Sequence, residues 1–251
     1  MKCVLITGAS SGIGQQLAID YAGAGWHVIA CGRDRDKLQQ ALADSPIGDF
    51  RVFDTTDTQA CETALAGDSE HIDLAILNAG TCEYIDNVRR FDATMFSRII
   101  NTNVLGTANC LAPLLRRMVR GSRIAIVSSS VTFLPLTRAE AYGASKAALD
   151  YLCRSLAIDC ANQGLEFTLI RPGFVDTPLT ERNDFAMPGR VDAATASNAI
   201  RRGLAQGKRE ICFPRLFTLI LRIFSRLPMN LWHCLAVRMV RKVKTREAAN
   251  G

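Results

Sequence analysis

The stretch that decides the fold is Thr7-Gly8-Ala9-Ser10-Ser11-Gly12-Ile13-Gly14. It follows the apolar run Val4-Leu5-Ile6 and precedes a helical stretch that begins Gln15-Gln16-Leu17-Ala18. Glycines permit a tight turn, and the first turn of a helix offers free N–H groups to an anion. This order predicts a phosphate-binding loop, with a glycine-rich turn that binds nothing as the alternative. The residues expected to contact the ligand are Gly8, Ser10, Ser11, Gly12, Ile13 and Gly14.

Short apolar runs alternate with longer segments of helical periodicity along the chain. Parallel strands that are buried on both faces read as unbroken apolar runs, and right-handed crossovers join them. We therefore predict an α/β fold, a single doubly wound Rossmann domain with a parallel sheet, over residues 1–210. Loops after the strands should face the active site. The runs cover residues 4–6, 28–30, 74–77, 124–127 and 167–170.

The composition of the 251-residue chain is that of a well-packed globular protein. Its nine cysteines are scattered and no two are spaced Cys-x-x-Cys, so we expect reduced thiols. His27, His71 and His233 lie far apart, and no metal site is expected. The N-terminus lacks the pattern of a secretory signal, which predicts a cytoplasmic protein.

The positive charge is concentrated in the last fifty residues. Residues 201–251 hold twelve Lys and Arg against Glu210 and Glu247, so they carry +10 while the rest carries −4. Apolar residues at helical spacing over 213–244 predict an amphipathic helical extension within residues 211–251. Three roles stay open: a lid, a subunit contact, and peripheral contact with an anionic membrane. Nucleic-acid binding is not expected, and neither stretch reaches the about twenty apolar residues of a membrane span.

Arg33 follows the expected second strand in Cys31-Gly32-Arg33-Asp34. Dinucleotide-binding folds usually place an acid there, where it binds the ribose hydroxyls. A guanidinium can instead form paired, charge-assisted hydrogen bonds with a 2′-phosphate. The position therefore favours NADP(H), and NAD(H) stays an alternative because Asp34 stands beside Arg33.

Tyr142 and Lys146 stand four residues apart, so they share one face if the segment is helical. A phenol with its ordinary pKa of about 10 is a poor proton shuttle near neutral pH. An ammonium about 5 Å away would stabilise the phenolate by roughly 3 kcal/mol, or about two pKa units. The pair alone also fits an ordinary exposed helix face. Ser129, which follows the run 124–127 and precedes Tyr142 by thirteen residues, favours the catalytic interpretation.

Between Thr7 and Thr177 the chain resembles the short-chain dehydrogenase/reductase family. Leu77 stands where that family usually has Asn, and residues after 200 match no motif of the family. The matching motifs are residues 7–14, Asn78-Ala79-Gly80, Asn101-Thr102-Asn103 with Gly106, Ser129, Tyr142 with Lys146, and Pro172-Gly173-Phe174-Val175-Asp176-Thr177.

The resemblance implies an oxidoreductase that moves a hydride between NADP(H) and a carbonyl or alcohol carbon. Tyr142 would be the general acid in reduction and the general base in oxidation. Lys146 would lower the pKa of Tyr142 and bind the nicotinamide ribose. Ser129 would hydrogen-bond the carbonyl oxygen, and Asn103 would hold a water that links Lys146 to solvent. Asn103 is preferred over Asn101 because Val104-Leu105-Gly106 follows it.

The resemblance also implies cofactor contacts outside the first loop. Asp54 would contact the adenine amino group, with Thr55 beside it. Asn78, Ala79 and Gly80 would brace the central strand. The nicotinamide would be flanked by Pro172, Gly173, Val175 and Thr177, with the Val175 backbone and the Thr177 hydroxyl fixing its carboxamide.

Apolar residues dominate the expected substrate wall and favour an apolar carbonyl or alcohol substrate. Arg138 and Arg182 are expected at the surface, although either could receive an anionic group if it pointed inward. A homodimer or tetramer would pair through the helices that carry Tyr142 and Asn103. The alternatives are a non-catalytic nucleotide-sensing or scaffold protein and an epimerase or dehydratase relative. The wall residues are Val131, Phe133, Leu134, Leu136, Leu179, Phe185 and Met187.

Overall fold

The computed structural model describes residues 1–67, 71–181 and 183–247, with side chains described up to residue 238. Its centre is one parallel sheet with the strand order β3-β2-β1-β4-β5-β6-β7. The order reverses between β1 and β4, which opens a crevice at the carboxyl ends of these strands. The strands are β1 Cys3–Thr7, β2 His27–Gly32, β3 Asp49–Val52, β4 Leu74–Leu77, β5 Arg123–Val127, β6 Glu166–Pro172 and β7 Glu210–Phe213.

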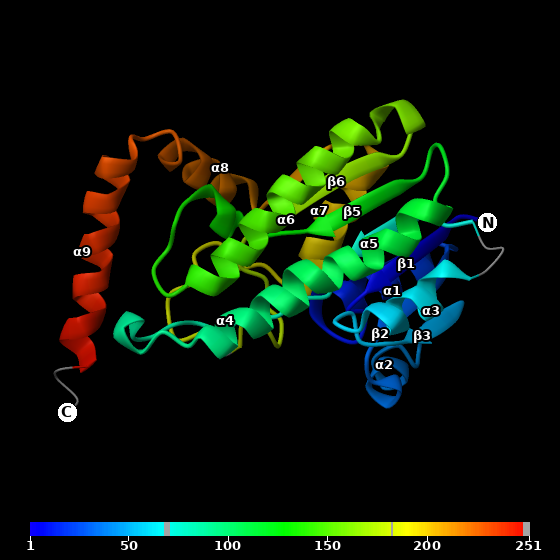
Figure 1. Cartoon of the computed structure of the whole chain (residues 1–251), viewed down its shortest axis with the longest axis horizontal. Helices are drawn as coiled ribbons and strands as arrows, with labels where there is room; N and C mark the ends of the chain where they lie inside the picture. The colour runs from blue at the N-terminus through cyan, green and yellow to red at the C-terminus, as the bar shows by residue number, and fades with distance from the viewer. Residues whose placement is uncertain (68–70, 182, 248–251) are drawn as a thin grey trace.

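Helices cover both faces of the sheet, as a doubly wound fold requires (Figure 1). One apolar cluster joins the sheet to α3, α5 and α6, and the other joins it to α1, α2 and α7. The predicted α/β fold with a parallel sheet is confirmed. The helices of the two layers, with α4, are α1 Gly12–Gly23, α2 Arg35–Ala41, α3 Thr58–Ala66, α4 Ala93–Ile100, α5 Gly106–Arg117, α6 Glu140–Asp159 and α7 Ala193–Ala205.

Aspartates fix where several of these helices begin. The carboxylates of Asp34, Asp57, Asp92 and Asp192 each accept a hydrogen bond from a backbone N–H in the first turn of the helix that follows. Each such cap is worth about 1 kcal/mol and leaves the strand-to-helix loop with a defined end. The loops before α2, α3, α4 and α7 therefore each end at an anchored residue.

The helical extension begins after β7, with α8 Arg215–Phe224 and α9 Met229–Glu247. The sheet thus ends at Phe213, slightly beyond the boundary at residue 210 that composition suggested. Figure 1 shows α8 against one end of the body and α9 standing apart from the sheet. The Trp232 indole donates a 3.0 Å hydrogen bond to the Pro135 carbonyl, which fastens the first turn of α9 to the loop before α6. Within the described part of the chain, no helix is both long and apolar enough to cross a bilayer.

Candidate active site

The first loop has a backbone that only glycine fits well. Gly8 and Gly12 have φ values of +69° and +56°, in the left-handed region. A Cβ added to Gly14 would lie 2.2 Å from the Gly8 carbonyl oxygen, so a side chain there would push α1 away from the loop. The geometry leaves the N-terminus of α1 open toward the crevice, as a phosphate-binding loop requires.

Asn78 and Ala79 tie the end of β4 to this loop. The Thr7 hydroxyl accepts hydrogen bonds from the backbone N–H groups of Asn78 and Ala79, at 3.0 and 3.1 Å. The Asn78 amide donates to the Thr7 carbonyl at 3.1 Å. These contacts are the brace that the sequence predicted for this motif, and they do not involve Leu77.

A cleft of about 550 Å³ lies at the carboxyl edge of β1, β2 and β4. It is lined by most of the predicted cofactor residues, but not by Gly14, Tyr142, Lys146, Pro172, Gly173 or Val175. A Cβ on Gly12 would lie 2.9 Å from Thr177, which places the expected nicotinamide segment beside the phosphate loop. The predicted residues in the lining are Gly8, Ser10, Ser11, Gly12, Ile13, Arg33, Asp54, Thr55, Asn78, Ala79, Gly80 and Thr177.

Two cations gather at the adenosine end of the cleft. Arg33 and Lys37 both line it, and Lys37 was not predicted from the sequence. Asp34 uses its carboxylate to cap α2 by accepting from the Lys37 N–H at 3.0 Å, so this acid is engaged at the helix start. The hydrogen bond from the Thr56 N–H, together with the Thr56 hydroxyl and Arg33, lowers the pKa of Asp54. A nucleotide with a phosphate near its ribose fits this end of the cleft.

Tyr142 and Ser129 meet across the gap between α6 and the end of β5. Burial raises the pKa of Tyr142, and the hydrogen bond with Ser129 lowers it in part. Ser128 is turned the other way, because its hydroxyl donates to the Asp150 carboxylate and to the Lys146 carbonyl. The spacing argument that selected Ser129 from the run of three serines agrees with this geometry.

Lys146 is buried, and its ammonium donates to the Val127 carbonyl at 2.9 Å. Burial lowers the pKa of Lys146 to about 8. Its Nζ lies 5.7 Å from the centre of the Tyr142 ring. The expected net fall in the pKa of Tyr142 is not seen in this structure, because desolvation of the phenol raises the pKa and no lowering by Lys146 offsets it.

Asn103 is fully buried in a π-helical turn, Asn101–Leu105, that follows α4. Its side chain accepts from the Thr81 N–H at 2.7 Å and donates to the Thr81 carbonyl and the Ser145 hydroxyl, both at 2.9 Å. A Cβ on Gly80 would lie 3.1 Å from Asn103 Oδ1 and 3.5 Å from Lys146 Nζ, so both groups converge behind this wall of the cleft. The side chain braces Thr81, and the predicted water relay stays a prediction.

Cys82 and Tyr84 also belong to the site, although no motif indicated them. Burial raises the pKa of the Cys82 thiol, which hydrogen-bonds Tyr84 and lies close enough to Lys146 and Tyr142 to affect both. Burial likewise raises the pKa of Tyr84. The only sequence signal for either residue is its position directly after Asn78-Ala79-Gly80.

Arg138 is held by ion pairs at the active site, whereas the sequence favoured a cation at the surface. Its guanidinium pairs with Asp86 and Asp184, each at 2.6 Å, and lies 5.4 Å from the Tyr84 ring and 5.9 Å from the Phe185 ring. It thus joins three segments around the site: the loop after β4, the loop before α6 and the segment after Thr177. Arg182 lies outside the described residues.

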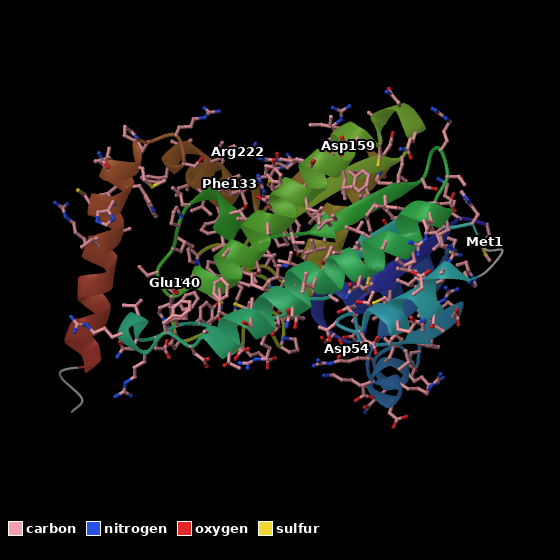
Figure 2. The ribbon with its side chains drawn as sticks, viewed as in Figure 1. Met1, Asp54, Phe133, Glu140, Asp159 and Arg222 are labelled. Carbon is pink, nitrogen blue, oxygen red and sulfur yellow. The ribbon has the colours of Figure 1, made fainter. Side chains whose placement is uncertain are left out.

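The expected substrate wall is only partly formed as predicted. Phe185 packs on Tyr84 with ring centres 5.4 Å apart, and Leu179 lines the cleft. Phe133 instead packs against the guanidinium groups of Arg171 and Arg222, which lie 4.7 and 5.3 Å from its ring centre; Figure 2 labels Phe133 and Arg222. These contacts tie Phe133 to β6 and α8, so Phe133 supports the fold of the loop.

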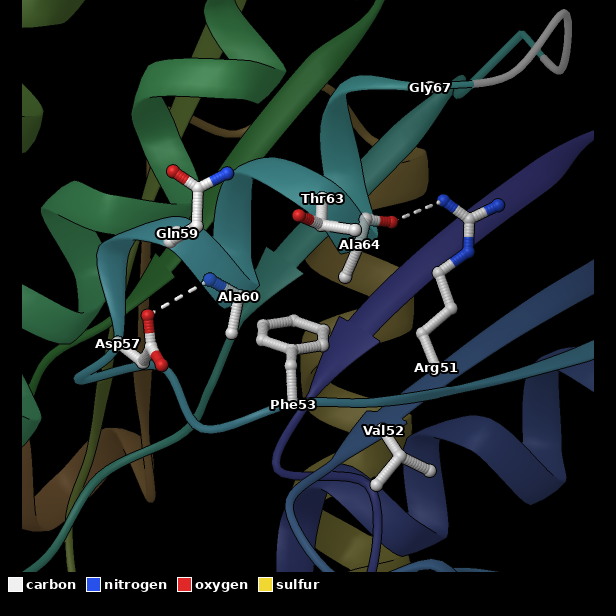
Figure 3. A pocket seen from close by; sticks show the side chains of 9 residues that line it. All are labelled: Arg51, Val52, Phe53, Asp57, Gln59, Ala60, Thr63, Ala64 and Gly67. Carbon is white, nitrogen blue, oxygen red and sulfur yellow. Dashed lines mark hydrogen bonds between the residues drawn. The ribbon is translucent and has the colours of Figure 1, made fainter.

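Figure 3 shows a second hollow, of about 660 Å³, between the end of β3 and α3. Its polar groups serve the local fold. Arg51 donates to the Ala64 carbonyl at 2.9 Å and pairs with Asp49, while Asp57 accepts from the Ala60 N–H at 3.0 Å. The hollow gathers no reactive set comparable with the one around Tyr142.

Known proteins resemble the chain in sequence and in structure. The sequence model of the family described as short chain dehydrogenase matches residues 2–186. An uncharacterized oxidoreductase of Myxococcus xanthus is 34% identical over 247 residues, covering 95% of this chain and 97% of the relative. A short-chain dehydrogenase from Sphingobium yanoikuyae, solved with NADPH, aligns over 91% of this chain and 97% of its own, with a TM-score of 0.77 and 24% identity. A relative from Burkholderia phymatum, solved with NAD, aligns over 88% and 92%, with a TM-score of 0.77 and 19% identity.

Proposed function

This chain belongs to the short-chain dehydrogenase family of oxidoreductases, and we propose that it transfers a hydride between NADP(H) and the carbonyl or alcohol carbon of an apolar substrate. The observation that carries the proposal is the position of Tyr142 beside Ser129 and one helical turn before the buried Lys146, whose Nζ lies 3.5 Å from where a Cβ on Gly80 would stand in the cleft wall. A bound nicotinamide nucleotide would supply or accept the hydride. The chain's own residues bind the reactants and transfer the proton.

Burial suits Tyr142 to the role of general acid. A raised pKa keeps the phenol protonated near neutral pH, so its proton is available to a carbonyl oxygen that gains negative charge. The Ser129 hydroxyl can hydrogen-bond the same oxygen. A charged Lys146 favours the phenolate that remains, because the cation lies one helical turn away. Reprotonation of Tyr142 from solvent, through Lys146 and a water held by Asn103, completes the proposed cycle.

NADP(H) is the proposed cofactor because Arg33 and Lys37 line the adenosine end of the cleft while Asp34 is engaged in capping α2. Paired cations complement a 2′-phosphate better than the hydroxyl of NAD(H). The NADPH-bound relative from Sphingobium yanoikuyae is consistent with this preference, and the NAD-bound relative from Burkholderia phymatum keeps NAD(H) as a weaker second cofactor.

An apolar substrate is proposed because Cys82 and Tyr84 lie beside Tyr142, Phe185 packs on Tyr84, and Leu179 lines the neighbouring cleft. A homo-oligomer is supported by exposed apolar residues on α6, where Tyr151 and Ile158 have exposed fractions of 80% and 76%. Sedimentation velocity would show a monomer if that face is unpaired. Nine free thiols fit a reducing compartment such as the cytoplasm.

Tyr142→Phe is the direct test of the proposed chemistry. We expect turnover of the best carbonyl substrate to fall about 10²- to 10⁴-fold, because the variant removes only the transferable proton. NADPH affinity, measured by fluorescence titration, should change no more than a few fold, because the Tyr142 hydroxyl lies outside the cleft lining.

Tyr151→Phe, on the exposed side of the same helix, is the matched control and should keep the wild-type rate. Near wild-type turnover in Tyr142→Phe would contradict the assignment. A non-catalytic nucleotide sensor is the competing function, and it predicts that the unmodified protein binds NADPH yet reduces nothing in a screen of ketones and aldehydes.

A further inference from the structure

We propose that the outward face of α8 docks this enzyme on the surface of an anionic lipid bilayer. Neither the proposed hydride transfer nor cofactor binding needs this surface. The face is made of large apolar side chains at helical spacing that stay exposed to solvent, although Phe224 also packs on Trp232 of α9. Their exposed fractions are 72% for Leu216, 53% for Leu219, 42% for Ile220, 55% for Ile223 and 37% for Phe224.

Contacts on the other side of α8 fix which way this apolar face points. Thr218 is buried and bonds the Pro214 carbonyl at 2.9 Å. The Phe217 ring packs on Phe174 with ring centres 5.7 Å apart. Arg222 donates to Glu210 at 2.9 Å and lies over Phe133 (Figure 2). Since these contacts hold α8 against the sheet and the loop after β5, the apolar stripe must face away from the protein.

The charge around the stripe identifies its partner. Residues 211–246 contain eight Lys and Arg and no acid. Arg215 and Arg226 are exposed: Arg215, in the first turn of α8, lies at one edge of the apolar stripe because it follows the same helical spacing as Arg222, and Arg226 lies in the turn that follows the helix. Apolar side chains bordered by cations fit a helix that lies flat at the headgroup level of an anionic membrane.

A second copy of the chain fits this face less well. In a twofold contact between two α8 helices, the same surface meets itself, so the arginine edges of both copies would come together. The start of α9 extends the lipid-facing surface, since Met229 and Leu231 have exposed fractions of 61% and 49%. Both helices lie at one end of the molecule, where a planar surface can reach them together (Figure 1).

The test is sedimentation of the full chain with phosphatidylcholine–phosphatidylglycerol vesicles and with vesicles of phosphatidylcholine alone. We expect binding to the anionic vesicles at low salt, weaker binding at high salt and little binding to the neutral vesicles. Leu219→Ser with Ile223→Ser should lower the partition coefficient about tenfold or more, because two inserted apolar side chains are lost. Arg215→Gln with Arg226→Gln should lower it about fivefold for each cation removed.

Val52→Ser with Val119→Ser is the matched control, because it removes two exposed apolar side chains from surfaces outside α6, α8 and α9. This control should sediment like the unmodified protein. The proposal is overturned if the full chain stays in the supernatant with anionic vesicles at low salt, or if neither α8 variant weakens binding. It is also overturned if sedimentation velocity without vesicles shows that Leu219→Ser with Ile223→Ser splits an oligomer, since a second copy would then cover the face.

Discussion

The positive charge of Arg33 should determine the preference for NADPH over NADH. Replacement by Asp puts a carboxylate where the 2′-phosphate is expected, so repulsion replaces a charge-assisted pair worth about 1.5–3 kcal/mol. We expect Arg33→Asp to weaken NADPH binding about ten- to hundredfold while NADH binding changes little. Calorimetric titration of both nucleotides measures the difference.

The control for this change is Arg35→Asp, which alters an exposed cation two residues further on, outside the cleft lining. It should leave the ratio of the two affinities unchanged. Equal affinity of the unmodified protein for NADPH and NADH would count against the role of Arg33.

Residues that belong to a linear motif could be predicted, and residues that reach the site through folding could not. Ser129, Tyr142 and Asn103 stand at characteristic spacings, and the structure brings Ser129 to Tyr142 and brings Asn103 to the same Gly80 wall as Lys146. Cys82 and Tyr84 carry no spacing signal, because only the path of the loop after β4 brings them to Tyr142. The direction of the pKa change at Tyr142 was also beyond the sequence, since it depends on how completely the phenol is buried.

At the scale of elements, strands buried on both faces were visible in the sequence and edge strands were not. β1 and β4 are completely buried, so each reads as an apolar run. β3 and β7 form the two edges of the sheet and keep polar residues such as Asp49 and Glu210. The composition boundary at residue 210 fell inside β7 for the same reason, because a short edge strand contributes little to a hydrophobic pattern.

The segment after Thr177 is held at the active site by contacts through Arg138. Arg138→Leu would remove its ion pairs with Asp86 and Asp184 and its contacts with two aromatic rings. We expect KM for an apolar substrate to rise up to about tenfold, because the segment after Thr177 loses roughly 1 kcal/mol of stabilisation in its position at the active site. The value of kcat should change less, because Tyr142 and Ser129 are untouched. Steady-state kinetics with the best available substrate measures both.

Arg116→Leu provides the comparison for Arg138→Leu. Arg116 also pairs with a carboxylate, Glu62, but between α5 and α3, away from the cleft. If KM stays at the wild-type value in Arg138→Leu, or rises equally in Arg116→Leu, the ion pairs of Arg138 do not hold the segment after Thr177 in the position that binds substrate.

At the scale of the whole molecule, a charged network connects the catalytic helix to the helical extension. Asp150 on α6 accepts from Ser128 and pairs with Arg171 on β6. Arg171 also pairs with Glu210 on β7, and Glu210 in turn pairs with Arg222 on α8. The buried members are mutually paired, which offsets the cost of removing their charges from water. The network fixes β7 and α8 relative to the loop that carries Ser129.

Lys146 should leave a measurable signature in the stability of the whole protein. Its folded pKa of about 8 lies below the ordinary value of 10.5, so between these pH values the unfolded chain binds more protons than the folded one. The free energy of unfolding should therefore rise with pH across this window, by up to about 1.4 kcal/mol per pH unit for one proton. Buried cysteines with raised pKa values act in the opposite direction. The pH dependence of the free energy of unfolding is therefore compared between the unmodified protein and Lys146→Met. Urea unfolding at several pH values in the window should give a steeper rise for the unmodified protein, whereas parallel curves would mean that Lys146 keeps an ordinary pKa in the fold.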